Sequence, residues 1–285
     1  MVILGRVQGW ESRGITYEAD PKQSEKIFKT FNITDKSKKL TTNGTRSEDG
    51  RKEEGEDDEK LDAGLSTEFR GVAARMNYYA VDAPNIQFST KEVCRRMATP
   101  TVGAWSMAKR LGRYILGTHK VTWEYPWQNK QEEVNVYADS DWAGCGVTRK
   151  STSGGVIMLG MHCLKTWSST QPVIALSSGE AEYYAMIDAA TRTMGLQASM
   201  KELGTKVELV MHTDSSAAKA FASRRGAGKI RHVEVKVLWL QEAVACGRLK
   251  VKKVLGTENP ADLMTKYHNA EATKKNLAKM NIQVK

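Results

Sequence analysis

The chain has 285 residues, 40% of them hydrophobic and 27% charged, which is the composition of a globular protein with one or two domains. No apolar run approaches the roughly 18 residues that a membrane helix needs, and the apolar start is too short for a secretory signal, so we expect a cytoplasmic or nuclear protein that is not secreted. The four cysteines show no CxxC pairing and the five histidines no H-x3-H spacing, which argues against a zinc site or a disulfide framework.

The net charge of +10 is distributed unevenly along the chain. Residues 46–60 contain eight acids and four bases, so the remainder of the chain carries +14. A basic body suggests a polyanionic partner, most simply a nucleic acid. On charge alone, a basic protein without such a partner explains the composition equally well.

Residues 1–65 predict a small folded piece followed by a linker. In residues 1–40, the strand-like Ile15–Ala19 precedes a helix, with Asp20 as its N-cap and Pro21 as its first residue. Residues 41–65 are rich in Lys, Gly and acids, which predicts a disordered acidic linker. Such a linker could occupy a basic groove, but a solvated spacer is the simpler interpretation.

Residues 66–127 predict a helical connection segment. Its three helices begin at Ser66, which opens a capping box, near Ile86 and after Thr99. Their polar faces are basic, with Arg70, Arg75, Arg95, Arg96, Lys109, Arg110 and Arg113. Basic helices suit a nucleic-acid backbone, although a solvated face explains each residue singly. The aromatic stretch Trp123–Trp127 leads into the next region.

Residues 134–268 alternate between strands and helices, and residues 269–285 follow as a basic C-terminal tail. The predicted strands are Val134–Asp139, Ser153–Gly160, Cys163–Ser169, Val207–Thr213 and Arg248–Leu255. The predicted helices cover 177–200 (interrupted or ended near residue 195), 214–222, 231–245 and a last segment from residue 259. This order predicts an α+β fold with a mixed five-stranded sheet flanked by helices.

Four acids lie at the ends of these elements or on a helix face, beside apolar runs: Asp139, Glu182, Asp214 and Asp262. Charges in such places need a partner or a metal ion. Two Mg²⁺ ions held by carboxylates can activate water and stabilise a leaving oxygen, so the pattern predicts a Mg²⁺-dependent nuclease. Asp141 and Glu180 compete as ligands, and Asp214 or Asp262 could instead cap a helix. Spacing leaves these alternatives open.

Several blocks of this region occur in a familiar order: Ala138–Gly144, Arg149–Gly155, Trp167–Ser169, Gln171–Tyr183, Thr213–Ser215, Arg231–Glu234 and Ala261–Lys266. Through them, residues 134–268 resemble the ribonuclease H domain in the Pol polyprotein of copia-type LTR retrotransposons. Residues 69–118 resemble the connection segment of these polyproteins. Residues 1–40 are similar, more weakly, to the end of the reverse transcriptase thumb.

The resemblance implies a ribonuclease H-like fold and Mg²⁺-dependent endonucleolytic cleavage of the RNA strand in an RNA–DNA hybrid. It implies that Asp139, Glu182, Asp214 and Asp262 bind two Mg²⁺ ions, which Mn²⁺ could replace, and it selects Asp139 over Asp141 and Glu182 over Glu180. We expect the hybrid to contact Ser140, Arg149, Lys150, Ser178, Ser215, Arg224, Arg225 and Lys229.

The chain contains no polymerase active site, because Ser140 replaces the second acid of a Tyr-x-Asp-Asp box. The fingers and palm of a reverse transcriptase are therefore an expected partner, and a membrane is not. An active element would place the chain in a cytoplasmic virus-like particle. The alternatives are a catalytically silent, nucleic-acid-binding remnant and a two-metal fold acting on DNA. Gly256–Asn259 stands where many cellular ribonucleases H carry a histidine that aids product release.

Overall fold

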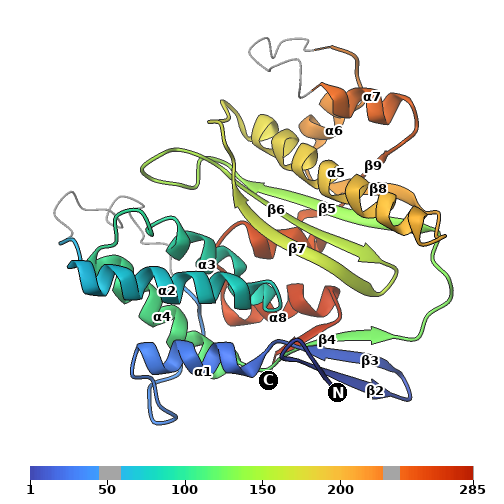
Figure 1. The fold of residues 1–285 in the computed structure, drawn as a ribbon. Coiled ribbons are helices and arrows are strands. Elements are labelled where there is room, and N and C mark those ends of the chain that lie inside the picture. The colour runs from blue at the N-terminus through green and yellow to red at the C-terminus, as the bar shows by residue number, and fades with distance from the viewer. Residues whose placement is uncertain (45–58, 227–237, 285) are drawn as a thin grey trace. The chain divides into compact units, whose positions relative to one another are not determined.

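The structure, a computed structural model, describes residues 1–44, 59–226 and 238–284. It divides into two compact units (Figure 1). The first unit consists of Met1–Trp127 and Lys266–Lys285, and the second of Gln128–Thr265. Most of the predicted acidic linker, residues 45–58, lies outside the described residues, as does 231–237 of a predicted helix.

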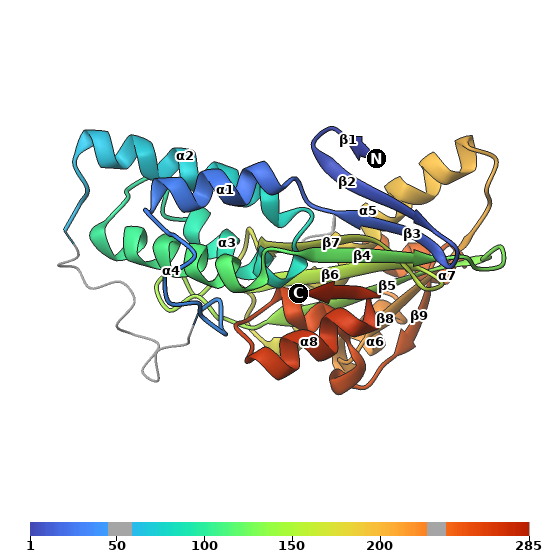
Figure 2. The same ribbon diagram turned by 90° about the horizontal axis from the view of Figure 1, so that it is seen from below.

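A five-stranded antiparallel sheet organises the first unit. Its strands, in spatial order, are β1 (Val2–Ile3), β2 (Arg6–Glu11), β3 (Gly14–Glu18), β4 (Val121–Pro126) and β10 (Ile282–Val284). Figure 2 shows β2, β3 and β4 side by side, with the C-terminal strand, in dark red, next to β4. Only a part of β3 was expected from the sequence.

The C-terminal residues belong to this sheet and are not a tail. Asn269 caps helix α8 (Ala270–Lys279) by accepting from the Ala272 N–H, and β10 follows it and pairs with β4. The prediction that residues 269–285 form a tail is therefore wrong, because they form a helix and a strand. A three-residue strand is too short to show a period, and its partner lies about 160 residues earlier in the chain.

The remaining helices of the first unit are α1 (Pro21–Thr30), α2 (Ala63–Ala80), η1 (Pro84–Ile86), α3 (Gln87–Cys94) and α4 (Val102–Thr118). Asp20 caps α1 as predicted, since its side chain accepts from the Lys22 N–H. Helix α2, however, begins before the predicted Ser66. Its cap is Asp62, which accepts from the Leu65 N–H and leaves a shorter linker than expected.

An ion pair between the half-buried Arg6 and the buried Asp82 connects the sheet of the first unit to the end of α2. Asp82, which is 5% exposed, accepts from Arg6 Nε at 2.8 Å and from the Tyr17 hydroxyl at 2.6 Å. Its backbone carbonyl accepts from the Trp123 indole at 2.8 Å. Burial, and then the hydrogen bond to Asp82, raise the pKa of Tyr17 above its ordinary value.

The second unit contains a mixed five-stranded sheet with helices beside it, which confirms this part of the predicted α+β fold. Its strands, in spatial order, are β7 (His162–Thr170), β6 (Thr152–Leu159), β5 (Glu133–Asp141), β8 (Glu208–Thr213) and β9 (Lys250–Lys253). The pairs β7–β6 and β6–β5 are antiparallel, whereas β5–β8 and β8–β9 are parallel.

Helices of the second unit are α5 (Ser178–Glu202), α6 (Ser216–Ala222), α7 (Trp239–Ala245), η3 (Gly256–Glu258) and η4 (Pro260–Met264). Helix α5 crosses one face of the sheet (Figure 1), and its Met186 and Ala189 share a buried core with Val136 of β5 and Met211 of β8. The expected interruption at Gly195 is wrong. A glycine inside a helix costs about 1 kcal/mol, which the buried face of α5 outweighs.

Candidate metal centre

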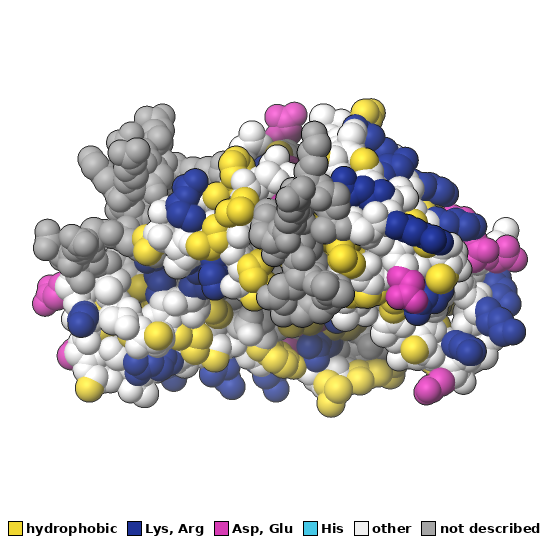
Figure 3. Space-filling model, turned by 90° about the horizontal axis from the view of Figure 1, so that it is seen from above, with side chains coloured by type: hydrophobic (Ala, Val, Ile, Leu, Met, Phe, Trp, Pro, Cys, Tyr) yellow, Lys and Arg dark blue, Asp and Glu magenta, His cyan; other side chains and the backbone are white. Residues whose placement is uncertain are grey.

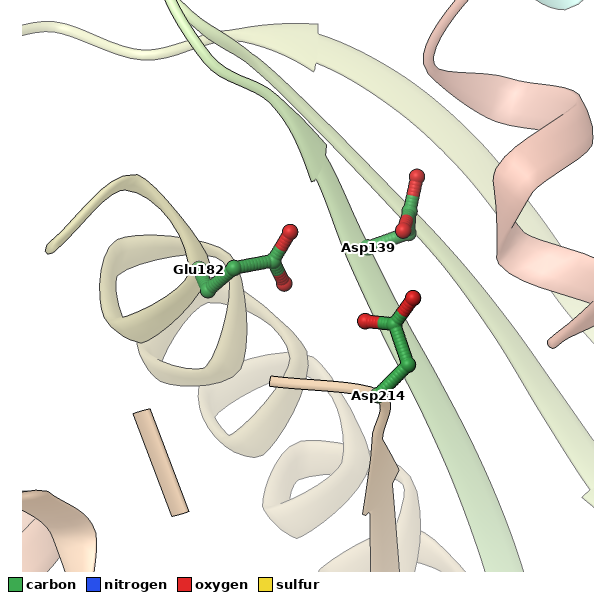
Figure 4. Close-up of side chains that lie close together, drawn as sticks. All are labelled: Asp139, Glu182 and Asp214. Atoms are coloured by element: carbon green, nitrogen blue, oxygen red, sulfur yellow. The ribbon is translucent and has the colours of Figure 1, made fainter. Parts of the chain in front are cut away.

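Among the described residues, Asp139, Glu182 and Asp214 form a group in which one carboxylate oxygen of each lies within 4.8 Å of the others. Figure 4 shows the three side chains converging from β5, from α5 and from the end of β8. Asp139 and Glu182 are buried, with 7% and 9% of their surface exposed, and Asp214 is half-buried. The structure thus brings together three of the four predicted acids.

The parallel pairing of β5 and β8 explains why the two aspartates meet. Tyr137 lies opposite His212 in this register, and two residues later come Asp139, within β5, and Asp214, directly after β8. A two-residue step returns a side chain to the same face, so both carboxylates leave the same edge of the sheet. Glu182 is held to this edge because its Oε1 accepts from the Ser140 N–H at 3.1 Å.

The competing acids have other roles. Glu180 is buried and its Oε2 accepts from the Leu176 N–H at 3.0 Å, while its own N–H donates to Ser177 Oγ at 3.2 Å. These bonds cap the start of α5 in the manner of a capping box, except that Glu180 accepts from the residue before the N-cap Ser177. The Asp141 carboxylate lies against the turn at Gly144, where an added Cβ would approach its Oδ2 to 2.0 Å. Neither acid is a member of the group of three.

Asp262 lies on η4, and its carboxylate is not among the three grouped acids. The segment that carries it is nevertheless attached to β5. The Asn259 side chain donates to the Ala138 carbonyl at 3.0 Å, and the Thr265 hydroxyl donates to Asp139 Oδ2 at 2.6 Å. Neither residue was predicted from the sequence.

The helix-cap alternatives for two of the acids are wrong. Ser215, and not Asp214, caps α6, since its Oγ accepts from the Ala218 N–H at 3.1 Å. Asn259, and not Asp262, caps η4 by accepting from the Ala261 N–H. The Asn259–Pro260 pair is a recognisable N-cap signal in the sequence. No local signal, by contrast, connects Thr265 with a residue 126 positions earlier.

The predicted serine contacts lie around this centre in different settings. The backbone N–H of Ser140 donates to Glu182, and Ser215 serves as the α6 cap. Ser178 is the first residue of α5 and is exposed. The structure therefore gives Ser140 and Ser215 a local role besides the predicted contact with a hybrid.

The predicted basic contacts lie in turns of the second unit. Arg149 is exposed, with a φ of 54°, and Lys150 follows it half-buried. The Arg224 guanidinium lies over the Phe221 ring, 4.4 Å from its centroid, and Arg225 is exposed. Lys229 lies outside the described residues. On the face shown in Figure 3, Lys and Arg side chains (dark blue) spread over much of the described surface and Asp and Glu (magenta) are fewer.

No protein-family model matches the chain. The chain is 35% identical over 136 residues to the uncharacterized mitochondrial protein AtMg00810 of Arabidopsis thaliana, a match that covers 45% of this chain and 55% of that protein. It is 31% identical over 197 residues to the retrovirus-related Pol polyprotein from transposon TNT 1-94 of Nicotiana tabacum, which covers 68% of this chain and 15% of the polyprotein. The chain thus spans about half of the first relative and a small part of the second.

Among solved structures, LC11-RNase H1, isolated from compost, is similar to this chain at 18% identity and a TM-score of 0.34. The superposed region covers 52% of this chain and 99% of that protein. Within the described residues, no helix combines the length and the apolar character needed to cross a membrane.

Proposed function

Because the chain is similar to the retrovirus-related Pol polyproteins of transposons, we propose that its second unit is a ribonuclease H of the copia type. It cleaves the RNA strand of an RNA–DNA hybrid endonucleolytically, in a Mg²⁺-dependent reaction, and leaves 3′-hydroxyl and 5′-phosphate ends. The observation that carries this proposal is the convergence of Asp139, Glu182 and Asp214 within 4.8 Å.

The donor set fits a hard divalent cation. Three carboxylates at this separation repel one another, and a cation between them removes that repulsion. The group offers oxygen donors without thiolate or imidazole, which suits Mg²⁺ or Mn²⁺ better than Zn²⁺. Asp139, Glu182 and Asp214 would hold the first ion. We assign Asp262 to a second ion for two reasons. Its segment is hydrogen-bonded to β5, and the resemblance to retrotransposon ribonuclease H domains implies a fourth metal-binding acid at this position.

The bound ions would lower the pKa of a water molecule and neutralise the charge that develops on the cleaved phosphate. The protein residues supply the orientation. The Ser140 N–H fixes one oxygen of Glu182, and the Thr265 hydroxyl fixes one oxygen of Asp139. A site that is oriented before the substrate arrives avoids reorganisation during the reaction.

Recognition of the hybrid would combine contacts to the sugar and to the phosphates. Selection of RNA over DNA requires contacts to 2′-hydroxyl groups in the minor groove, for which Ser140, Ser178 and Ser215 are the candidates. The basic side chains are assigned to the phosphates: Arg149, Lys150, Arg224, Arg225 and Lys229.

The test is cleavage of a hybrid labelled on its RNA strand, with and without Mg²⁺. Asp139→Asn is expected to lower the rate by roughly 10⁴-fold or more, the scale seen when one member of a catalytic group is removed. Asp141→Asn is the matched control, because this neighbouring acid lies outside the group of three, and it should keep most of the activity. Binding of the hybrid without any turnover would identify a silent remnant, and cleavage of duplex DNA would identify a DNA-acting enzyme.

A further inference from the structure

Two buried hydrogen bonds attach the η4 segment to consecutive residues at the end of β5. Asn259 Nδ2 donates to the Ala138 carbonyl at 3.0 Å, and Thr265 Oγ1 donates to Asp139 Oδ2 at 2.6 Å. The side chains of Asn259 and Thr265 are fully buried, each at 0% exposure. Water therefore does not compete for either bond, and the segment is held at both of its ends.

The packing of β6 supports the same attachment independently. Gly154 lies opposite Asp139 in the β5–β6 register. A Cβ added to Gly154 would lie 2.7 Å from the Met264 Cβ and 2.7 Å from the Thr265 Cγ2, closer than such atoms approach. The residue beside Asp139 on the next strand must therefore lack a side chain for η4 to rest on the sheet.

The Thr265 hydroxyl has two acceptors and a single proton. Its Oγ1 lies 2.6 Å from Asp139 Oδ2 and 3.0 Å from the Asp262 carbonyl. An ionised carboxylate is the stronger acceptor, and the shorter distance agrees with a charge-assisted bond. The Thr265 hydroxyl therefore donates its proton to Asp139. Its Oγ1 also lies 3.0 Å from the Asp262 carbonyl oxygen.

We propose that Thr265 is a positioning residue for the metal centre: its buried hydroxyl fixes the orientation of the Asp139 carboxylate and ties the Asp262 segment to it. This inference rests on the proposed function, since it assumes that Asp139 binds a cation. Donors to the ligands of a metal ion typically contribute a factor of about 10–100 to metal affinity. Removing the hydroxyl should therefore weaken cation binding without removing a ligand.

The test compares Thr265→Val, which keeps the shape but removes the donor, with Thr265→Ser, which keeps the donor. Mn²⁺ binding is measured by titration calorimetry on the full chain without nucleic acid. Thr265→Val should weaken Mn²⁺ binding about 10-fold or more, and Thr265→Ser should restore it to within about 2-fold of the unmodified chain. Thr193→Val is the control, since Thr193 is equally buried but donates to the Ala189 carbonyl within α5.

Hybrid cleavage provides a second measurement that a purely structural role would not move. The loss of rate in Thr265→Val should shrink as Mg²⁺ is raised, with the KM for the hybrid unchanged. If circular dichroism shows that Thr265→Val does not fold, Thr265→Ala is used with the same expectations.

The outcomes separate the inference from the proposed function. Equal Mn²⁺ affinity in Thr265→Val and the unmodified chain overturns the positioning role, while Mg²⁺-dependent cleavage by both leaves the nuclease intact. An unmodified chain that binds Mn²⁺ no better than Asp139→Asn overturns both.

Discussion

Each of the two units buries an aspartate beside its sheet, and the two aspartates are treated in opposite ways. In the first unit, Asp82 is 5% exposed and receives Arg6 and the Tyr17 hydroxyl. In the second unit, Asp139 is 7% exposed and lies with two further carboxylates, from Glu182 and Asp214. The first carboxylate is paired with a cationic side chain of its own unit, whereas the second group is the one that we propose binds a cation. The comparison sets a structural acid beside a proposed metal ligand.

The largest change in stability is expected when the ion pair between Asp82 and Arg6 is broken. Asp82→Asn leaves the half-buried Arg6 guanidinium without its counter-charge and the Tyr17 hydroxyl without its charged acceptor. Loss of one partner of a fully buried ion pair costs about 3–5 kcal/mol, and because Arg6 is only half-buried we expect the free energy of unfolding to fall by about 2 kcal/mol. Urea denaturation measures this change. Cleavage per folded molecule should stay unchanged, and a variant as stable as the original would contradict the structural role of Asp82.

The matching substitution in the second unit should act in the opposite direction on stability. Without divalent cations, Asp139→Asn removes one of three mutually repelling charges while keeping an oxygen that accepts from Thr265. We expect the free energy of unfolding in EDTA to rise by about 1 kcal/mol, even though catalysis is lost. If Asp139→Asn destabilises the chain as strongly as Asp82→Asn does, the distinction between the two acids fails.

A smaller test concerns one thiol in each unit, the half-buried Cys94 and the buried Cys163. Burial raises the pKa of Cys94, in the first unit, to about 11 and that of Cys163, in the second, to about 12. Cys246 is exposed. At pH 8 we therefore expect iodoacetamide to label Cys246 first, and the labelling of Cys94 to increase as the pH rises towards 11, because the thiolate is the reactive form. Mass spectrometry of the labelled peptides measures the order, and equally fast labelling of Cys94 would contradict its burial.

The two units also differ in how far the sequence predicts them. The strands of the second unit were predicted from runs of apolar residues, and the cap at the start of α5 could have been predicted from Ser177 and Glu180, three residues apart. The sheet of the first unit includes two strands of only two and three residues, β1 and β10, and the partner of β10 is distant in the chain. Local patterns contain no information about such pairings.

The same limit applies inside the metal centre. The strand ends that carry Asp139 and Asp214 follow from the alternation of apolar residues, and their meeting follows from parallel pairing. Which of Glu180 and Glu182 faces them depends on the rotation of α5 against the sheet, which is set by core packing. The hydrogen bond from Thr265 to Asp139 connects the residue after η4 with β5. These segments are far apart in the sequence and meet only in the folded chain.

The most direct measurement is the cleavage of an RNA–DNA hybrid by the full chain in Mg²⁺ and in EDTA, with each strand labelled in turn. We expect fragments of the RNA strand alone, with 5′-phosphate ends, in Mg²⁺ and none in EDTA. Cleavage that persists in EDTA, or an intact RNA strand at every Mg²⁺ concentration with folded protein, would contradict it.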